Sequence, residues 1–208
     1  MQNVVPIERS VAARTLRDRA QVYADEVRRL IDATYAVMRR TDSLDPRVHD
    51  IVREAGLSNQ TFYRHFRGKD ELLLAVLDDG QARLVATVER RMARAEPDAG
   101  QVRAWIEGVY EQARNPKAAA NTRPFLVNGA RLAGRYPDAT ATQRERVVAP
   151  LREAVSTLGG DPVRDADAIY HVTMGRTQDA IARRGIPARD DVDHTVAFAL
   201  RAIGASGS

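Results

Sequence analysis

Residues 59–66 combine side chains that form hydrogen bonds with aromatic residues at a helical spacing. The polar side chains, which can all donate or accept hydrogen bonds, are Asn59, Gln60, Thr61, Tyr63, Arg64 and His65. Phe62 and Phe66 stand four positions apart, so both lie on one face of a helix. A short helix with an apolar back and a polar front fits the major groove of DNA, where base edges display a readable pattern of donors and acceptors. The chemistry that these residues favour is therefore hydrogen bonding to DNA.

A second short helix and a tight corner precede this segment and would position it. The helix is expected at residues 48–55, with its apolar side buried. Gly56 stands where the chain must leave that helix through a conformation that is costly for residues with a β-carbon. Leu57 would then fill the corner, and Ser58 can cap the helix that follows. The pattern predicts two short helices joined by a tight turn.

Three motifs in and after this turn resemble a known family. They are Ala55-Gly56-Leu57-Ser58, then Phe62-Tyr63-Arg64-His65-Phe66, then Lys69-Asp70-Glu71-Leu72. Their order, their spacing and their position near the N-terminus resemble the DNA-binding domain of the TetR family of transcriptional regulators. The resemblance implies a homodimeric repressor that binds an operator through a helix-turn-helix and binds a small molecule through its C-terminal domain.

The resemblance also assigns DNA contacts residue by residue. The positions that it matches to the recognition helix, to its phosphate contacts and to the helices on either side are Arg47, Ser58, Asn59, Gln60, Thr61, Tyr63, Arg64, His65 and Lys69. Many family members have threonine at the position of Arg47, where it caps a helix and contacts phosphate. Arginine can reach the phosphate but cannot cap in the same way. Val52 replaces a common alanine, which implies slightly different helix packing.

Apolar residues recur at helical steps of three and four through most of the chain, and no segment alternates with the period of a strand. The expected fold class is all-α, with a three-helix helix-turn-helix domain joined through a long helix to a C-terminal helical bundle. The expected domains are a basic flexible arm at 1–22, a DNA-binding domain at 23–70, and a ligand-binding and dimerisation domain at 71–208.

Proline, glycine and capping residues set the expected helix boundaries. Helices beyond those of the turn are expected at 21–40, 69–95, 101–114, 117–134, 138–158, 164–184 and 190–203. Pro124 and Pro150 fall inside two of these segments, so each is expected to kink its segment or to start a new helix.

Four arginines stand in the first twenty residues, at Arg9, Arg14, Arg17 and Arg19. Such residues can enter a minor groove from a flexible arm. Nearby acidic residues dilute this charge, which favours a disordered arm or an extension of the first helix.

The composition limits the kind of protein. The net charge of +4 favours polyanionic partners only mildly, and the chain has no cysteine, which excludes disulfides and cysteine-bound zinc. The four histidines lack the spacing of metal ligands, and no phosphate loop or nucleophile elbow is present. We therefore expect no metal, no cofactor and no enzymatic activity. Without a long apolar stretch or a secretory signal, we expect a cytoplasmic protein with no membrane partner.

Apolar stripes in the C-terminal half belong by default to a core, but the resemblance implies that part of this core is hollow and holds an effector. The candidate ligand-binding residues are Trp105, Val109, Tyr110, Phe125, Asn128, Met174 and Gln178. They combine an apolar wall with the few polar groups that such pockets need.

The two last expected helices carry apolar and small residues that let helices approach closely. The candidate dimer-interface residues are Ile169, Tyr170, Thr173, Thr177, Ile181, Val196, Ala199, Leu200 and Ile203. The alternative is that the same residues are buried within one chain; the resemblance, which implies a four-helix bundle between two copies, favours the dimer.

The sequence therefore favours a TetR-like repressor that a small apolar or amphipathic effector releases from its operator. Its expected partners are operator DNA, a second copy of the chain and an effector of unknown identity. Two alternatives stay open: a helical enzyme, and a helical adaptor whose helix-turn-helix does not bind DNA. No acid, base or nucleophile constellation supports the enzyme. The polar front of residues 59–65 argues against the adaptor, because interaction surfaces more often expose apolar anchors.

Overall fold

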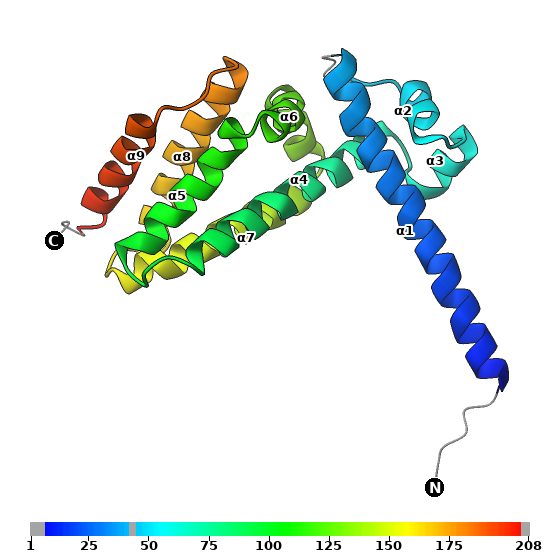
Figure 1. Cartoon of the computed structure of the whole chain (residues 1–208), viewed down its shortest axis with the longest axis horizontal. Helices are drawn as coiled ribbons and strands as arrows, with labels where there is room; N and C mark the ends of the chain where they lie inside the picture. Colours follow the sequence, from blue (N-terminus) through cyan, green and yellow to red (C-terminus); the bar gives the residue numbers. More distant parts are fainter. Residues whose placement is uncertain (1–6, 42–44, 205–208) are drawn as a thin grey trace, which may run out of the picture. The chain divides into compact units, whose positions relative to one another are not determined.

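The computed structural model describes residues 7–41 and 45–204, without the side chains of residues 7–13, 127 and 128. Within these ranges the chain forms nine α-helices and no strand (Figure 1), which confirms the all-α prediction. Their bounds are α1 (Ile7–Thr41), α2 (Val48–Ala55), α3 (Asn59–His65), α4 (Lys69–Met92), α5 (Ala99–Arg114), α6 (Pro116–Arg135), α7 (Pro137–Thr157), α8 (Arg164–Ala182) and α9 (Arg189–Ala202). None of the described helices has both the length and the apolar character that crossing a membrane requires.

The chain divides into two units, and Met1–Ala75 is the first. Within it, α1 packs against α2, and α2 packs against α3. The core of this unit is built from Leu30, Ile51, Phe62 and Leu72, whose side chains are fully buried. Because each of these residues comes from a different helix, one shared core fixes the positions of α2 and α3.

The start of the chain differs from the expected flexible arm at residues 1–22. Residues 7–22 belong to the 35-residue helix α1, while residues 1–6 lie outside the described ranges. Arginine, alanine, leucine and glutamine are good helix formers, and the Gln21 amide donates to the Asp25 carboxylate one turn later, at 2.9 Å. The segment therefore extends a helix that the core has already nucleated.

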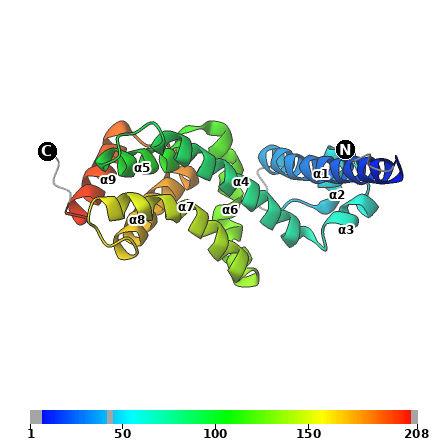
Figure 2. The same ribbon diagram turned by 90° about the horizontal axis from the view of Figure 1, so that it is seen from below.

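The second unit, Val76–Ser208, is organised around α5, which contacts α6, α7, α8 and α9 (Figures 1 and 2). Trp105 and Tyr110 on α5 are almost fully buried. The indole Nε1 of Trp105 donates to the Val147 carbonyl at 2.9 Å, and the Tyr110 hydroxyl bonds the Thr195 hydroxyl at the same distance. Both buried aromatic residues therefore satisfy their polar atoms within the core.

The expected dimer-interface residues need a correction. Seven of them are at most 7% exposed in the single chain and belong to its own interior: Ile169, Thr173, Thr177, Ile181, Val196, Ala199 and Ile203. The reason is that α8 and α9 both pack against α5, and the apolar stripe of each helix is buried there. Tyr170 and Leu200 are half-buried at the edge of the same core. A contact surface on these helices must use their other faces.

Pro124 and Pro150 lie inside α6 and α7. Neither starts a new helix, contrary to one of the two expected outcomes. A proline removes one backbone donor from a helix. In both helices the flanking turns continue on either side of the proline.

Candidate nucleic-acid interface

The turn between α2 and α3 has the conformation that Gly56 was predicted to provide. Gly56 adopts φ 61° and ψ 38°, in the left-handed region, and ends α2. The Ser58 hydroxyl accepts a hydrogen bond from the Thr61 backbone N–H at 3.0 Å and thereby caps α3. The chain changes direction within a few residues, and the turn and the cap together hold α3 next to α2.

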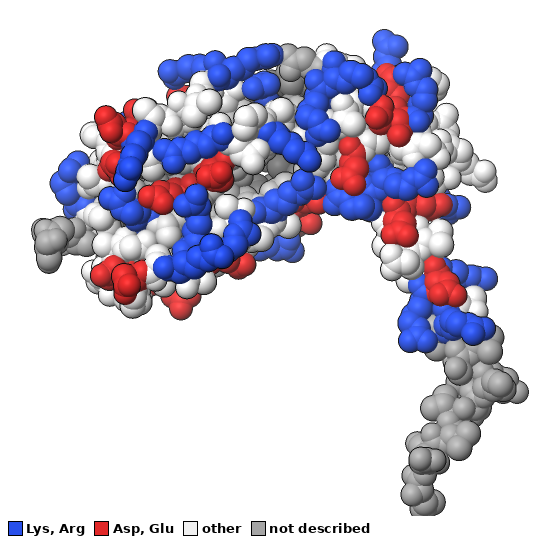
Figure 3. Space-filling view, viewed as in Figure 1, with Lys and Arg blue, Asp and Glu red and all other residues white. Residues whose placement is uncertain are grey.

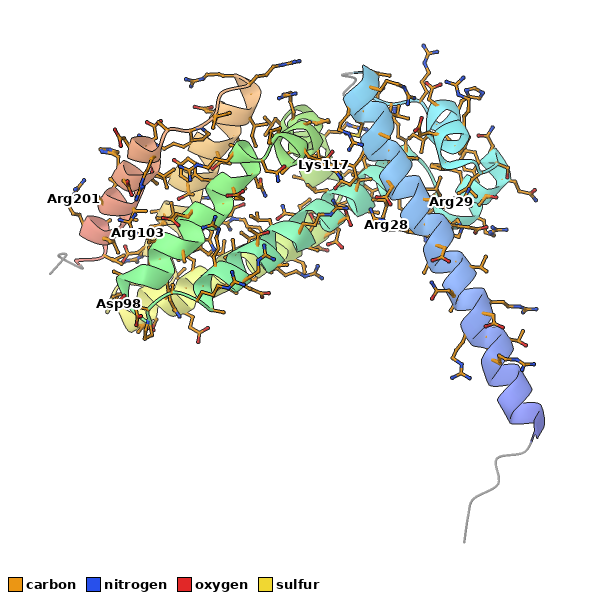
Figure 4. The ribbon with its side chains drawn as sticks, viewed as in Figure 1. Arg28, Arg29, Asp98, Arg103, Lys117 and Arg201 are labelled. Carbon is orange, nitrogen blue, oxygen red and sulfur yellow. The ribbon has the colours of Figure 1, made fainter. Side chains whose placement is uncertain are left out.

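Arg29 of α1 holds this turn from the side and was missed by the sequence analysis (Figure 4). Its guanidinium donates to the Ala55 carbonyl from Nε at 3.0 Å and from Nη2 at 2.6 Å, and to the Gly56 carbonyl at 3.1 Å. A β-carbon at Gly56 would lie 3.0 Å from Nη2 of Arg29. The turn thus needs glycine for its left-handed conformation, and a β-carbon there would in addition press on the end of the Arg29 side chain. No local pattern marks Arg29, since it lies 26 residues before the carbonyl that it binds.

Helix α3 has the predicted apolar back and polar front. Phe62 is fully buried, and its ring lies 5.8 Å from that of Phe66, measured between centroids. Asn59 and Gln60 are exposed on the other side, and 62% of Tyr63 is accessible to solvent. These exposed side chains can meet a partner, because the buried phenylalanines anchor the helix from its other side.

Two of the predicted DNA contacts are instead tied to α1. The Arg64 Nη2 and the His65 Nε2 both hydrogen-bond to Oε2 of Glu26, each at 2.6 Å. The His65 side chain has no exposed surface, and its ring lies 4.2 Å from that of Tyr23, in an edge-to-face arrangement. The prediction that His65 contacts DNA is therefore wrong for this structure. The Arg64 side chain stays 57% exposed.

The remaining predicted contacts flank the helix-turn-helix. Arg47 precedes α2, is exposed, and makes no capping hydrogen bond, as the departure from threonine suggested. Lys69 at the start of α4 forms an ion pair with Asp45. Arg67 follows α3, in the segment between α3 and α4, and is exposed; the sequence analysis did not single it out.

The Glu26 carboxylate connects α1 to the end of α3. Hydrogen bonds from Arg64 and then His65 hold the pKa of the Glu26 carboxyl below its ordinary value of 4.5, against a smaller opposing effect of desolvation. Because the pKa is lowered in the folded chain, the ionised carboxylate contributes stability above pH 4.5. That contribution is lost as the pH falls through the pKa of the folded state.

Replacing Glu26 with glutamine should therefore lower the melting temperature of the full chain at pH 7. The difference from the wild type should shrink as the pH falls below 4.5, because the wild-type carboxylate becomes protonated there. Thermal unfolding followed by circular dichroism at several pH values measures this difference. Glu96→Gln, an exposed carboxylate on the second unit, is the matched control. A difference between Glu26→Gln and wild type that stays constant from pH 7 to pH 3 would contradict this account.

A groove opens in the second unit between α4, α5 and α7. Its volume is about 760 Å³, within the range of small-molecule sites. Its apolar lining comes from Ala82, Val85, Ala86, Met92, Ala149 and Pro150, and its polar lining includes Glu89, Gln101, Arg146 and Glu153. Arg146 also forms an ion pair with Asp78 at 3.1 Å. The small alanine side chains leave the space open between the helices.

None of the predicted effector residues lines this groove. Trp105, Val109 and Tyr110 are core residues, so the prediction that they line a hollow pocket disagrees with the structure. Phe125 and Met174 are half-buried and Gln178 is exposed, while the Asn128 side chain lies outside the described residues. The resemblance implied that part of this core is hollow, but the structure packs Trp105, Val109 and Tyr110 in the core and has its groove elsewhere.

Comparison with known proteins identifies similar chains. Residues 30–76 match the family described as bacterial regulatory proteins, tetR family. No curated protein matches the sequence.

Several solved structures share the fold. One is a protein from Mesorhizobium loti assigned to the TetR family, with 19% identity, a TM-score of 0.68, and coverage of 86% of this chain and 96% of that one. A TetR-family transcriptional regulator from Streptomyces coelicolor has 22% identity and a TM-score of 0.65, covering 92% and 96%. A TetR transcription regulator from Haloarcula marismortui has 16% identity and a TM-score of 0.66, covering 88% and 98%.

Proposed function

We propose that this chain, which belongs to the TetR family of transcriptional regulators, is a homodimeric repressor that a small apolar or amphipathic effector releases from its operator. The family consists of regulators and not of enzymes. The observation that carries the proposal is the helix α3, whose exposed polar front is fixed by the buried Phe62 and by the clamped turn before it. A regulator of this kind acts on chromosomal DNA and therefore in the cytoplasm.

The DNA contacts divide into two groups. Asn59, Gln60 and Tyr63 are exposed on α3 and can meet base edges or phosphates in the major groove. Arg47 and Lys69 stand at the starts of the neighbouring helices and provide cationic groups for phosphates, which position a protein without reading sequence. Lys69 would exchange its ion pair with Asp45 for a phosphate.

Dimerisation gives two recognition helices, which can then bind half-sites about 34–36 Å apart, one turn of DNA. The faces of α8 and α9 that point away from α5 are available for a second copy. Phe198 on α9 is 43% exposed, and an exposed aromatic residue is a typical anchor of an interface. Gly175 on α8 is also exposed and permits close helix approach. Sedimentation of the wild-type chain tests this proposal, and a monomer at micromolar concentration would contradict it.

The groove between α4, α5 and α7 is our candidate effector site. Its alanine, valine and methionine lining suits an apolar body, and polar groups such as Gln101 and Arg146 can orient one end of a ligand. An effector lifts repression only through a difference in affinity between the DNA-bound and the released conformations. Small amphipathic molecules can be screened for release of the protein from DNA in the assay below.

Fluorescence anisotropy with the DNA upstream of the chain's own gene tests the repressor, beside a scrambled fragment of equal length. We expect selective binding that Tyr63→Ala and Lys69→Ala each weaken by about 1 kcal/mol or more, or about fivefold in Kd. The matched control is Lys117→Ala, since Lys117 is the other of the two lysines in the chain and lies exposed on the second unit. Binding to both fragments that is equally weak and salt-sensitive would leave only charge attraction. No binding at low salt would overturn the proposal in favour of an adaptor.

A further inference from the structure

The N-terminal part of α1 has no packing partner in the first unit. Every residue from Arg14 to Val22 is exposed, whereas Leu30 and Tyr35 further along the same helix are buried. Figure 1 shows this part of α1 continuing past α3. The match to the family begins only at residue 30, so the segment lies outside the matched domain. We call residues 14–22 the α1 extension.

The α1 extension is basic. It carries Arg14, Arg17 and Arg19 against the single acidic residue Asp18. None of the three arginines is ion-paired with any residue in the described ranges. In Figure 3, blue atoms cover more of the visible face of this part of α1 than red atoms do. Other arginines of the first unit, such as Arg40 and Arg64, are paired with carboxylates, whereas the three arginines of the extension keep their charge available for a partner.

The extension starts beside the recognition helix. The Tyr23 ring packs against His65, and Glu26 accepts hydrogen bonds from Arg64 and His65 at the end of α3. Arg19 stands four residues before Tyr23 and seven before Glu26, so it lies on the side of α1 that faces α3. From Tyr23 to Arg14 the helix advances roughly 13 Å. The basic segment therefore adjoins the end of α3. If α3 lies in a groove of DNA, the phosphates of both strands border that groove on either side.

We propose that the α1 extension binds the phosphate backbone of DNA next to the groove that α3 occupies. Arg14, Arg17 and Arg19 neutralise phosphates and add affinity without reading sequence, since phosphate contacts carry no direct sequence information. This inference rests on the DNA binding of the proposed function. A second copy of the chain is the other occupant to consider, because Leu16, Val22 and Tyr23 are exposed apolar residues. The unpaired arginines favour DNA, since charge of one sign on two identical copies repels. So does the position of the extension directly before Tyr23 and Glu26, which contact α3.

The test is the salt dependence of DNA binding by the full chain. In the triple variant Arg14→Gln/Arg17→Gln/Arg19→Gln, the slope of log K against log salt should fall by about 0.9 for each phosphate that the variant no longer neutralises. We expect a fall of about 2 or more per dimer, with an equal decrease in affinity for the upstream and the scrambled fragments. Glutamine is a good helix former, and circular dichroism checks that the variant keeps its helix content.

A matched control removes the same charge elsewhere. Arg90→Gln/Arg94→Gln/Arg164→Gln replaces three exposed arginines of the second unit, and its salt slope should equal that of the wild type. An unchanged slope in the extension variant overturns the inference. So does a decrease confined to the upstream fragment, which would indicate base reading, or a changed sedimentation coefficient, which would indicate contact between copies. Failure of the wild type itself to bind either fragment is a different result and overturns the proposed function as well.

Discussion

A Phe62→Ala variant is expected to lose DNA binding while residues 76–208 stay folded. Phe62 is fully buried at the back of α3, and truncating a buried phenylalanine costs about 3–5 kcal/mol. Domains of about this size are marginally stable. That loss is a large part of the stability that the first unit, Met1–Ala75, can have. The recognition helix would then have no fixed position from which to meet a groove.

Two spectroscopic probes separate the units in this experiment. Trp105 is the single tryptophan of the chain and lies buried in the second unit, so its fluorescence in urea reports that unit alone. Far-ultraviolet circular dichroism reports both units. Phe62→Ala should add an early phase to the circular dichroism curve and leave the tryptophan midpoint unchanged. One coincident shift of both probes would show that the cavity destabilises the whole chain and would contradict this prediction.

The neighbouring residue provides the control for Phe62. Tyr63 is 62% exposed, so Tyr63→Ala should change stability by no more than about 0.5 kcal/mol. It should still weaken DNA binding, because the tyrosine is on the polar front of α3. We expect both variants to lose DNA binding and only Phe62→Ala to unfold the first unit. That result would separate Phe62, which holds α3 in place, from Tyr63, which would contact DNA.

The second large effect is expected at Trp105 in the centre of α5. Trp105→Ala removes a fully buried side chain and should destabilise the second unit by about 3–5 kcal/mol. The Val147 carbonyl also loses the indole donor that lies 2.9 Å from it. Since the variant has no tryptophan, unfolding is followed by circular dichroism, where the later transition should move to lower urea.

An exposed apolar residue of the same unit is the control for Trp105. Ile186 is 73% exposed, and Ile186→Ala should leave the urea midpoint within about 0.5 kcal/mol of the wild type. If Trp105→Ala were equally mild, Trp105 would line a hollow and adaptable site. That outcome would restore the prediction that it belongs to an effector pocket.

Local patterns were enough to predict the helix-turn-helix. Helices at residues 48–55 and 59–66 follow from apolar spacing, and the structure ends the second of them one residue earlier. The left-handed turn at Gly56 and the cap from Ser58 follow from the residue types alone. These features depend on interactions within a few residues, and the sequence displays such interactions directly.

Contacts between distant residues could not be predicted in the same way. Arg29 binds the carbonyl of Ala55, and Glu26 binds Arg64 and His65, at separations of 26 to 39 residues. From the sequence, His65 is one more polar residue on a recognition helix. Only the packing of α1 against α3 turns it inward, because the spatial neighbours of a side chain depend on how helices cross.

The sequence by itself determined that the chain is all-helical, that α3 has one polar face, and which faces of the later helices are apolar. The tertiary structure alone decided what those apolar faces pack against. Ile169, Thr173 and Val196 lie in a stripe that suits either a partner or the chain's own core, and α5 buries it. The physical reason is that helical periodicity predicts which face of a helix is buried. Which other helix or chain packs on that face depends on the arrangement of all the helices.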